Sequence, residues 1–267
     1  MPDGYAPSGD DRVFYRDRGS GQAVIFIHAG VADSRMWLPQ LEKAPSGFRY
    51  VAYDQRGFGN SAVGNTKFKA YEDALAVMDY LAIESAVLVG CSMGGGVALD
   101  VAIEEPQRVE GLVLIGADSP GFEAKPFQSP QWPDVVRAFE AGDFDRVADL
   151  EAEIWLAGHG RDIGDVDPEI QEIFKEMDLV ALRNEERREE LEQPGPERAT
   201  GILEVDTPTL VMVGEYDLPS MHENAHDLAS KLSRRAPTVI EGTAHLPSLE
   251  RPDALNTALV GFLDSLT

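Results

Sequence analysis

The sequence is poor in cysteine and in long apolar runs. Its one cysteine, Cys91, cannot form a disulfide within the chain, which fits a reducing compartment, and its 43% of apolar residues are ample for a core. No stretch reaches the roughly 18 apolar residues of a membrane-spanning helix. Residues 1–11 lack the basic and apolar regions of a secretory signal peptide, so we predict that they form a loose arm. These absences favour a cytoplasmic protein without a membrane anchor.

Basic residues are also scarce. The chain has 23 Lys and Arg against 47 Asp and Glu, a net charge of −24. Such a surface repels phosphate backbones and anionic lipids, so neither nucleic acid nor a membrane is expected as a partner. The sequence has no H-E-x-x-H, no Cys/His cluster, no Walker motif and no G-x-G-x-x-G after a predicted strand. We therefore expect no metal and no cofactor.

One stretch combines an apolar run, a glycine-rich turn and a helical pattern. Residues 85–89 predict a buried strand, residues 90–94 (Gly-Cys-Ser-Met-Gly) fit G-x-S-x-G, and small or apolar residues at 97–102 follow helical spacing. The two glycines permit the close contacts of a sharp strand-to-helix turn, which lifts the Ser92 hydroxyl clear of the sheet. The same turn aims the N–H of Met93, at a helix N-terminus, at the point where an oxyanion could form. We predict that Ser92 is a nucleophile.

Two other side chains near these motifs carry reactive groups. Cys91 precedes Ser92 and points the other way along a strand, so we predict a small buried residue beneath the turn and not a reactive thiol. His28 follows the apolar run 23–27. We predict that it hydrogen-bonds neighbouring loops, because a better candidate for a catalytic base occurs later in the chain.

Predicted strands and helices alternate along most of the chain. Strands are expected at 13–16, 23–27, 49–53, 85–89, 109–115, 209–213 and 238–240, and helices at 71–81, 97–104, 218–232 and 252–266. This alternation predicts an α/β fold with a mostly parallel sheet flanked by helices.

The segment 118–205 interrupts the alternation. It contains no convincing strand, and it holds 23 acidic and 9 basic residues. Helices are expected there at 133–141, 144–157, 168–177 and 179–191. We predict an all-helical insert between two strands of the sheet.

An acid and a base follow two late strands. Asp217 ends Gly-Glu-Tyr-Asp after the strand 209–213, and His245 lies just after the strand 238–240. Because ligands of parallel sheets bind at the carboxyl ends of strands, we expect both residues to converge with Ser92. An imidazole accepts the serine proton and returns it to the leaving group, while a carboxylate orients the imidazole. Asp118, after the strand 109–115, is the alternative acid.

Four motifs together resemble the serine-nucleophile branch of the α/β-hydrolase superfamily. They are the elbow Gly-Cys-Ser-Met-Gly-Gly at 90–95, the loop Asp-Gln-Arg-Gly-Phe-Gly-Asn-Ser at 54–61, Gly-Glu-Tyr-Asp at 214–217 and Gly-Thr-Ala-His at 242–245. The resemblance implies an α/β-hydrolase core of residues 1–117 and 206–267, with a helical cap, 118–205, inserted after the sixth strand. It also implies that Arg56 and Asp54 tie loops together beside the elbow.

The resemblance further implies an oxyanion hole. In the family, a His-Gly-x turn after an early strand gives the second N–H. Here Ala29 stands where glycine is usual, so we assign the N–H to Gly30, with Ala29 as the alternative.

These residues predict a serine hydrolase that cleaves a small carboxylic ester or lactone through an acyl-enzyme. The stretch 33–37 and the elbow resemble those of enol-lactonases, and cofactor-free haloperoxidases, which make peracids at the same triad, are similar too. The alternative from another class is a non-catalytic small-molecule receptor on the same fold. Trp37, Trp132 and Trp155 are predicted to line the substrate pocket, although aromatic residues of the insert could instead form its own core. The sequence does not indicate an oligomeric state.

Overall fold

The computed structural model describes residues 3–125, 129–233 and 235–266. These residues form an eight-stranded sheet with the order β1-β2-β4-β3-β5-β6-β7-β8. The strands are β1 (Gly4–Ser8), β2 (Asp11–Gly19), β3 (Gly21–Ile27), β4 (Gly47–Tyr53), β5 (Ala86–Cys91), β6 (Val109–Ile115), β7 (Thr209–Gly214) and β8 (Thr238–Ile240). Neighbours from β4 to β8 pair in parallel, whereas β2 is antiparallel to both β1 and β4. The predicted α/β class and mostly parallel sheet are confirmed.

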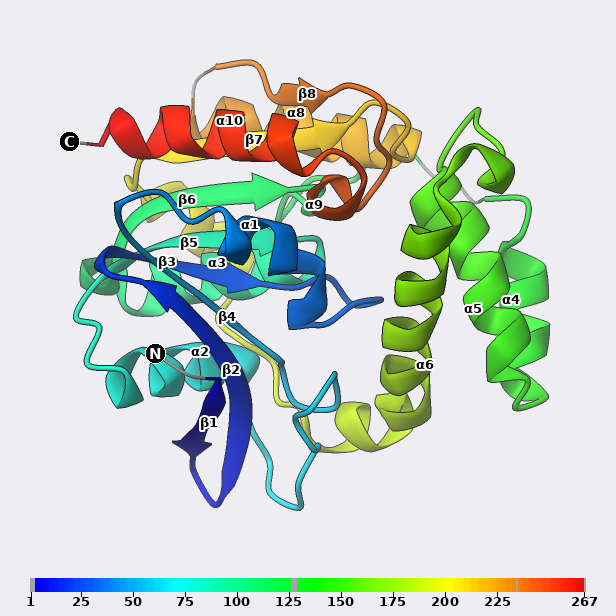
Figure 1. Ribbon diagram of the computed structural model, residues 1–267, viewed down its shortest axis with the longest axis horizontal. Coiled ribbons are helices and arrows are strands. Elements are labelled where there is room, and N and C mark those ends of the chain that lie inside the picture. The colour runs from blue at the N-terminus through cyan, green and yellow to red at the C-terminus, as the bar shows by residue number, and fades with distance from the viewer. Residues whose placement is uncertain (1–2, 126–128, 234, 267) are drawn as a thin grey trace.

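Helices cover both faces of this sheet (Figure 1). On one face lie α2 (Ala70–Tyr80), α3 (Met93–Glu104) and α8 (Pro219–Leu232), whose apolar side chains form one core with the sheet. On the other face lie α1 (Leu38–Glu42), α9 (Pro247–Glu250) and α10 (Pro252–Asp264). Every residue of β5 is buried, which is why the central strands read as continuous apolar runs. None of the described helices combines the length and the apolar character needed to cross a bilayer.

The N-terminal residues differ from the prediction. The expected loose arm is wrong for Gly4–Ser8, which form β1 at the edge of the sheet, and β2 is longer than the predicted strand 13–16. Ala6 and Ser8 are buried, and the guanidinium of Arg56 donates a hydrogen bond of 2.8 Å to the carbonyl oxygen of Ser8. The polar composition hid this strand because an edge strand needs few apolar residues and tolerates Pro7.

The segment after β6 is helical. It contains α4 (Trp132–Glu140), α5 (Phe144–Ala152), a π-helical turn at Glu153–Ala157, α6 (Pro168–Leu191) and the short α7 (Arg198–Gly201). Its described residues form no strand and only one isolated bridge, from Glu192 to Phe68. The helices α4, α5 and α6 stand beyond the carboxyl ends of the parallel strands (Figure 1).

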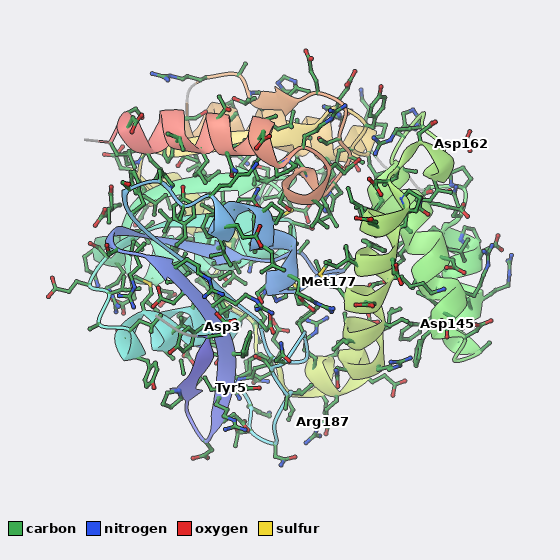
Figure 2. All side chains as sticks on the ribbon, viewed as in Figure 1. Asp3, Tyr5, Asp145, Asp162, Met177 and Arg187 are labelled. Carbon is green, nitrogen blue, oxygen red and sulfur yellow. The ribbon has the colours of Figure 1, made fainter. Side chains whose placement is uncertain are left out.

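The helix α6 joins this segment to the body that carries the sheet. The two helices expected at 168–177 and 179–191 are one continuous helix, because no glycine or proline separates them. Phe174 and Met177 are fully buried in the same core as the sheet, and Figure 2 shows Met177 on the side of α6 that faces the sheet. Asp145 and Asp162 lie on the outer surface in the same view.

Candidate active site

Ser92 occupies the sharp turn between β5 and α3. Its backbone has φ 52° and ψ −117°, a conformation that costs a non-glycine residue about 1–3 kcal/mol. The turn is held by the N–H of Ser92, which donates to the carbonyl oxygen of Ile115 at 2.8 Å. A Cβ at Gly90 would lie 2.3 Å from the Gly94 oxygen, and a Cβ at Gly94 would lie 2.3 Å from the Ile27 oxygen. Only glycine fits at both positions, as the motif predicts.

His245 and Asp217 form a buried pair after β8 and β7. The ring Nδ1 of His245 lies 2.9 Å from Oδ2 and 3.1 Å from Oδ1 of Asp217. The N–H of Leu218 donates to the same Oδ1 at 2.8 Å, which fixes the carboxylate. The ring of Trp155 packs 4.6 Å from the His245 ring, measured between centroids. The imidazole is therefore oriented by a carboxylate on one edge and by an indole on one face.

The charge of Asp217 changes the proton affinity of His245. Burial alone lowers the pKa of His245, but the attraction of Asp217, its hydrogen bond and the more distant Asp118 outweigh burial. The pKa is therefore raised above the ordinary value of 6.5. Such an imidazole accepts a proton readily at neutral pH.

Gly116 permits this pair to form, and sequence reasoning missed it. Its φ is +53°, and a Cβ there would lie 3.0 Å from Oδ2 of Asp217 and 3.0 Å from the ring of His245. The available signal was a glycine directly after the strand that ends at Ile115, on the edge where the site was expected.

His245 and Ser92 both line a cavity of about 240 Å³. Ser92, Met93, Gly30 and His245 line one side of it. Trp155 and side chains of α5 and α6 line the other. Among the described residues, the Ser92 hydroxyl has no hydrogen-bond partner, which does not rule out the predicted role because catalytic hydrogen bonds often tighten only when substrate binds.

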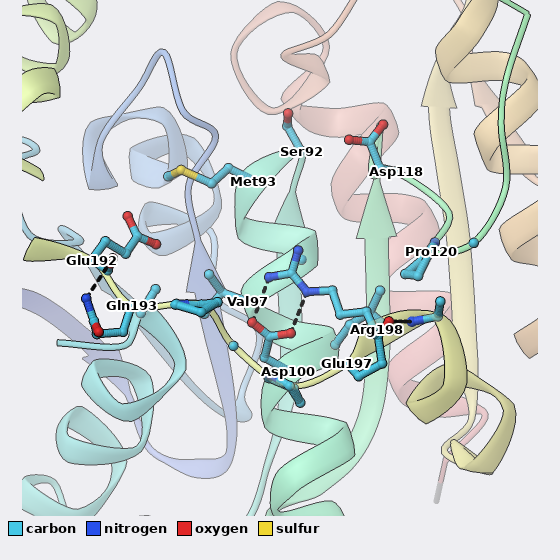
Figure 3. A pocket seen from close by; sticks show the side chains of 18 of the residues that line it. Ser92, Met93, Val97, Asp100, Asp118, Pro120, Glu192, Gln193, Glu197 and Arg198 are labelled. Carbon is cyan, nitrogen blue, oxygen red and sulfur yellow. Dashed lines mark hydrogen bonds and ion pairs between the residues drawn. The ribbon is translucent and has the colours of Figure 1, made fainter. Parts of the chain in front are cut away.

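A larger cavity of about 730 Å³ adjoins Ser92 from another direction. Figure 3 shows Ser92 and Asp118 at one end and Arg198 beside Asp100 on α3. The Nη2 of Arg198 donates to Oδ2 of Asp100 at 2.6 Å. His245 lines only the smaller cavity, so the smaller one brings the predicted base and nucleophile together.

The two predicted oxyanion donors also meet in the smaller cavity. Met93 begins α3, so its N–H has no partner within the helix. No acceptor among the described residues takes the N–H of Gly30, whereas the N–H of Ala29 donates to the sulfur of Met36 at 3.5 Å. The structure thus leaves the N–H groups of Gly30 and Met93 available and engages that of the alternative, Ala29.

The three predicted pocket tryptophans separate. Trp155 lines the smaller cavity. Trp37 is fully buried in the core, where its ring packs 5.1 Å from that of Phe26, and Trp132 is 38% exposed at the start of α4. Neither lines either of the two cavities at Ser92, so the structure does not support the placement of Trp37 and Trp132 in the pocket. Their side-chain directions depend on packing that the sequence pattern does not reveal.

The structure agrees with the structural roles predicted for His28 and Cys91. The Nδ1 of His28 donates to the Ala29 carbonyl oxygen at 2.8 Å, and its Nε2 accepts the N–H of Gln55 at 2.9 Å. Cys91 is buried, and burial raises the pKa of its thiol.

Asp118, the alternative acid, is exposed and accepts a hydrogen bond of 3.1 Å from Asn224.

The loop at 54–61 connects neighbouring segments as expected. Oδ1 of Asp54 accepts the N–H of Ser34 at 2.8 Å, and Oδ2 accepts that of Asn60 at 2.7 Å. Arg56 forms ion pairs with Asp73 at 2.9 Å and with Asp11 at 2.8 Å. These contacts hold the N-terminal strands and α2 beside the elbow.

Sequence reasoning also missed the polar residues that α5 and α6 contribute to the smaller cavity. They are Glu151 from α5 and Asp178, Glu185 and Arg188 from α6. The residues of α6 follow helical spacing and so share one face. This spacing can be recognised only when α6 is known to be a single helix.

The comparisons decide the family. The family described as alpha/beta hydrolase fold matches residues 22–157, just over half of the chain. The chain belongs to the alpha/beta hydrolase family. It is 26% identical to AB hydrolase superfamily protein YisY of Bacillus subtilis (strain 168), over 95% of this chain and 96% of that protein. Carboxylesterase YbfK of the same organism is 29% identical over 90% of this chain and 80% of that protein.

Further similarities extend over nearly the whole alpha/beta hydrolase chain. The non-heme haloperoxidase of Rhodococcus erythropolis is 28% identical over 95% of this chain and 96% of that protein. The solved structure of the enol-lactonase from Burkholderia xenovorans LB400 is 22% identical and superposes with a TM-score of 0.77, over 98% of this chain and 100% of that one. The expected α/β-hydrolase fold is confirmed.

Proposed function

We propose that this alpha/beta hydrolase is a serine hydrolase that cleaves a small carboxylic ester or lactone through an acyl-enzyme. The observation that carries the proposal is that His245, hydrogen-bonded to the buried Asp217, lines the same cavity as Ser92, which lies on a strained strand-to-helix turn. Nucleophile, base and orienting acid are the three groups that acyl transfer by serine requires.

The proposed reaction begins when the Ser92 oxygen attacks the carbonyl carbon of the substrate. His245 takes the serine proton, and Asp217 stabilises the imidazolium that forms. The N–H groups of Gly30 and Met93 hold the negative oxygen of the tetrahedral intermediate. Collapse of the intermediate expels the alkoxide oxygen, which receives the proton from His245. A water molecule, activated by the same imidazole, then hydrolyses the acyl-enzyme.

We propose a role for the helical segment as well. Its helices α5 and α6 line the side of the cavity that faces Ser92, which supports a cap of residues 118–205 on a core of residues 1–117 and 206–267. A cap that covers the site excludes water from the reacting groups.

The relative named carboxylesterase supports ester cleavage, and the relative named haloperoxidase favours a second candidate. In that candidate, hydrogen peroxide takes the place of water in the second step, so the acyl-enzyme yields a peracid. The test is peracid formation from acetate ester and hydrogen peroxide, compared with the rate of hydrolysis. A peracid rate above the hydrolysis rate would favour the second candidate.

Hydrolysis of p-nitrophenyl acetate, butyrate and octanoate tests the main proposal. We expect the wild type to be active and Ser92→Ala to lose activity by several orders of magnitude, because residual catalysis without the triad is about 10³–10⁴ over water. Ser230→Ala, on the exposed surface of α8, is the control and should match the wild type. Labelling by a fluorophosphonate reports the reactivity of Ser92 separately. A protein that neither hydrolyses these esters nor reacts with the probe would indicate the receptor alternative.

A further inference from the structure

Two carboxyl side chains form part of the cavity wall across from the serine. Glu151 comes from α5 and Asp178 from α6, and both line the same cavity as Ser92 and His245. Glu151 is 9% exposed and Asp178 is 1% exposed. The two carboxyl groups are close enough to alter each other's pKa, and a hydrogen bond between two carboxyl groups requires that they share a proton. We call these two residues the carboxyl pair.

The carboxyl pair lacks partners that could balance its charge. The Oδ2 atom of Asp178 is buried and receives no hydrogen bond from an N–H group or hydroxyl of the described residues. Within the described residues, no Lys, Arg or His forms an ion pair with Glu151 or Asp178. A buried carboxyl group without a donor or a counter-charge is costly, so the shared proton alone satisfies the pair.

The surroundings make the cavity more negative. Glu185 lines it as well, two turns after Asp178 on the same face of α6. The cation that lines it, Arg188, is engaged by Glu192, with 2.9 Å between Nη1 and Oε2. Burial raises the pKa of Glu151 to about 7, and the hydrogen bond to Asp178 only partly opposes this rise. A positive group that enters the cavity would relieve this excess, whereas a carboxylate would increase it.

The kind of positive group follows from the number of ligands. No cluster of three or more His, Cys, Asp or Glu in the described ranges is arranged to hold a metal ion. An ammonium group needs fewer ligands, because it donates up to three hydrogen bonds and carries one positive charge. It can take the place of the shared proton, which leaves to solvent as the ammonium group binds. The indole of Trp155 lies in the same wall, and an aromatic face also attracts cations.

We propose that the carboxyl pair binds an ammonium group of the substrate, so that the preferred ester or lactone carries a protonated amine. This inference rests on the proposed function, since it assigns the substrate class of the same site. Glu151 and Asp178 are specificity-determining residues in this proposal, and the bond that breaks is still the ester bond at Ser92.

A binding experiment separates the inference from the chemistry. Ser92→Ala is titrated in a calorimeter with three esters of similar length, namely methyl 6-aminohexanoate, methyl heptanoate and monomethyl adipate, whose far ends are cationic, neutral and anionic. A shorter pair, methyl 3-aminopropanoate and methyl butanoate, allows for the depth of the cavity. We expect the ammonium ester of the better-fitting length to bind about tenfold more tightly than its neutral counterpart, because a charged hydrogen bond replaces an apolar contact. The anionic ester should bind most weakly.

Variants on α6 assign the preference to the carboxyl pair. In the Ser92→Ala background, Asp178→Asn should lower the ratio of ammonium to neutral affinity to within about twofold of unity. Glu186→Gln, which removes the same charge from the exposed side of α6, should leave the ratio unchanged. Glu151→Gln is the second variant if Asp178→Asn does not fold, and circular dichroism checks both.

Three results would overturn the inference: equal affinity for the ammonium and neutral esters, tightest binding of the anionic ester, or the same ratio in Asp178→Asn and Glu186→Gln. Failure of the proposed function looks different, because it is the absence of p-nitrophenyl ester hydrolysis by the wild type. A preference for ammonium esters without hydrolysis would support the carboxyl pair and refute the serine hydrolase. Hydrolysis without a preference for ammonium esters would support the serine hydrolase and refute the role of the carboxyl pair.

Discussion

Replacing Glu151 by glutamine is expected to make the stability of the protein depend less on pH. Burial raises the pKa of this carboxyl group from 4.5 to about 7 in the native state. Between these values the native state keeps a proton that the unfolded chain has lost, so the native state binds more protons. The free energy of unfolding therefore falls as the pH rises through this window and levels off above it. Glutamine has no proton to lose, and its amide can donate to Asp178.

The magnitude follows from the size of the shift. A rise of about 2.5 pH units corresponds to about 3 kcal/mol in total, of which about 2.5 kcal/mol falls between pH 5 and pH 8. The free energy of unfolding of Glu151→Gln, minus that of the wild type, should thus be about 2–3 kcal/mol higher at pH 8 than at pH 5. Each kcal/mol corresponds to a shift in Tm of about 2–4 °C for a protein of this size.

Urea denaturation at pH 5 and pH 8, followed by tryptophan fluorescence, measures this difference. Glu186→Gln removes a carboxylate from the exposed side of α6 and is the matched control. It should keep the wild-type dependence on pH to within about 0.5 kcal/mol, as is usual for a surface substitution. An identical pH dependence in Glu151→Gln and in the wild type would show that Glu151 is ionised in the native state, which would refute the reasoning.

Three further predictions concern the proposed triad. Asp217→Asn should lower kcat for p-nitrophenyl butyrate by about 10⁴, which is the loss in a serine protease whose orienting acid is changed to the amide. Asp118→Asn should lower kcat by less than about tenfold. Comparable losses in the two variants would contradict the assignment of the acid. The rate should rise with pH, with a midpoint above 6.5, because only neutral His245 accepts the serine proton and Asp217 raises the pKa of His245. Because the charge of Asp118 also raises this pKa, Asp118→Asn should lower the midpoint. A midpoint below 6.5 would argue against this environment. Gly116→Ala should lower kcat about 100-fold through its clash with the histidine and aspartate, whereas Gly142→Ala, which has φ +71° but nothing within 4 Å of its Cβ, should keep the wild-type kcat.

The sheet and the elbow could be predicted because their signals are local. The strand at Ala86–Cys91 is an uninterrupted apolar run, and glycines at 90 and 94 are demanded by contacts of 2.3 Å within the turn itself. The positions of Asp217 and His245 follow from the same rule, since each comes just after a parallel strand. The structure brings their side chains together, and their roles in catalysis stay predictions.

The elements that could not be predicted depend on contacts far along the chain. The strand β1 is polar, and it is held by pairing with β2 and by Arg56, which lies 48 residues after Ser8. Trp37 looked like a residue of the pocket, but its ring fills the core against β3. The acidic wall of the cavity was hidden for the same reason, because Glu151 and Asp178 meet only when α5 and α6 pack together.

The continuity of α6 has a consequence for how ligands reach Ser92. A helix of 24 residues is a rod of roughly 36 Å, and it carries Asp178 immediately after the buried Met177. To swing this rod outward would expose Phe174 and Met177, at about 1.5–3 kcal/mol for each side chain. Without a break near Asp178, half of the helix cannot move alone. Any molecule that enters the smaller cavity therefore meets a wall that moves only as a whole helix, at the cost of exposing these two side chains.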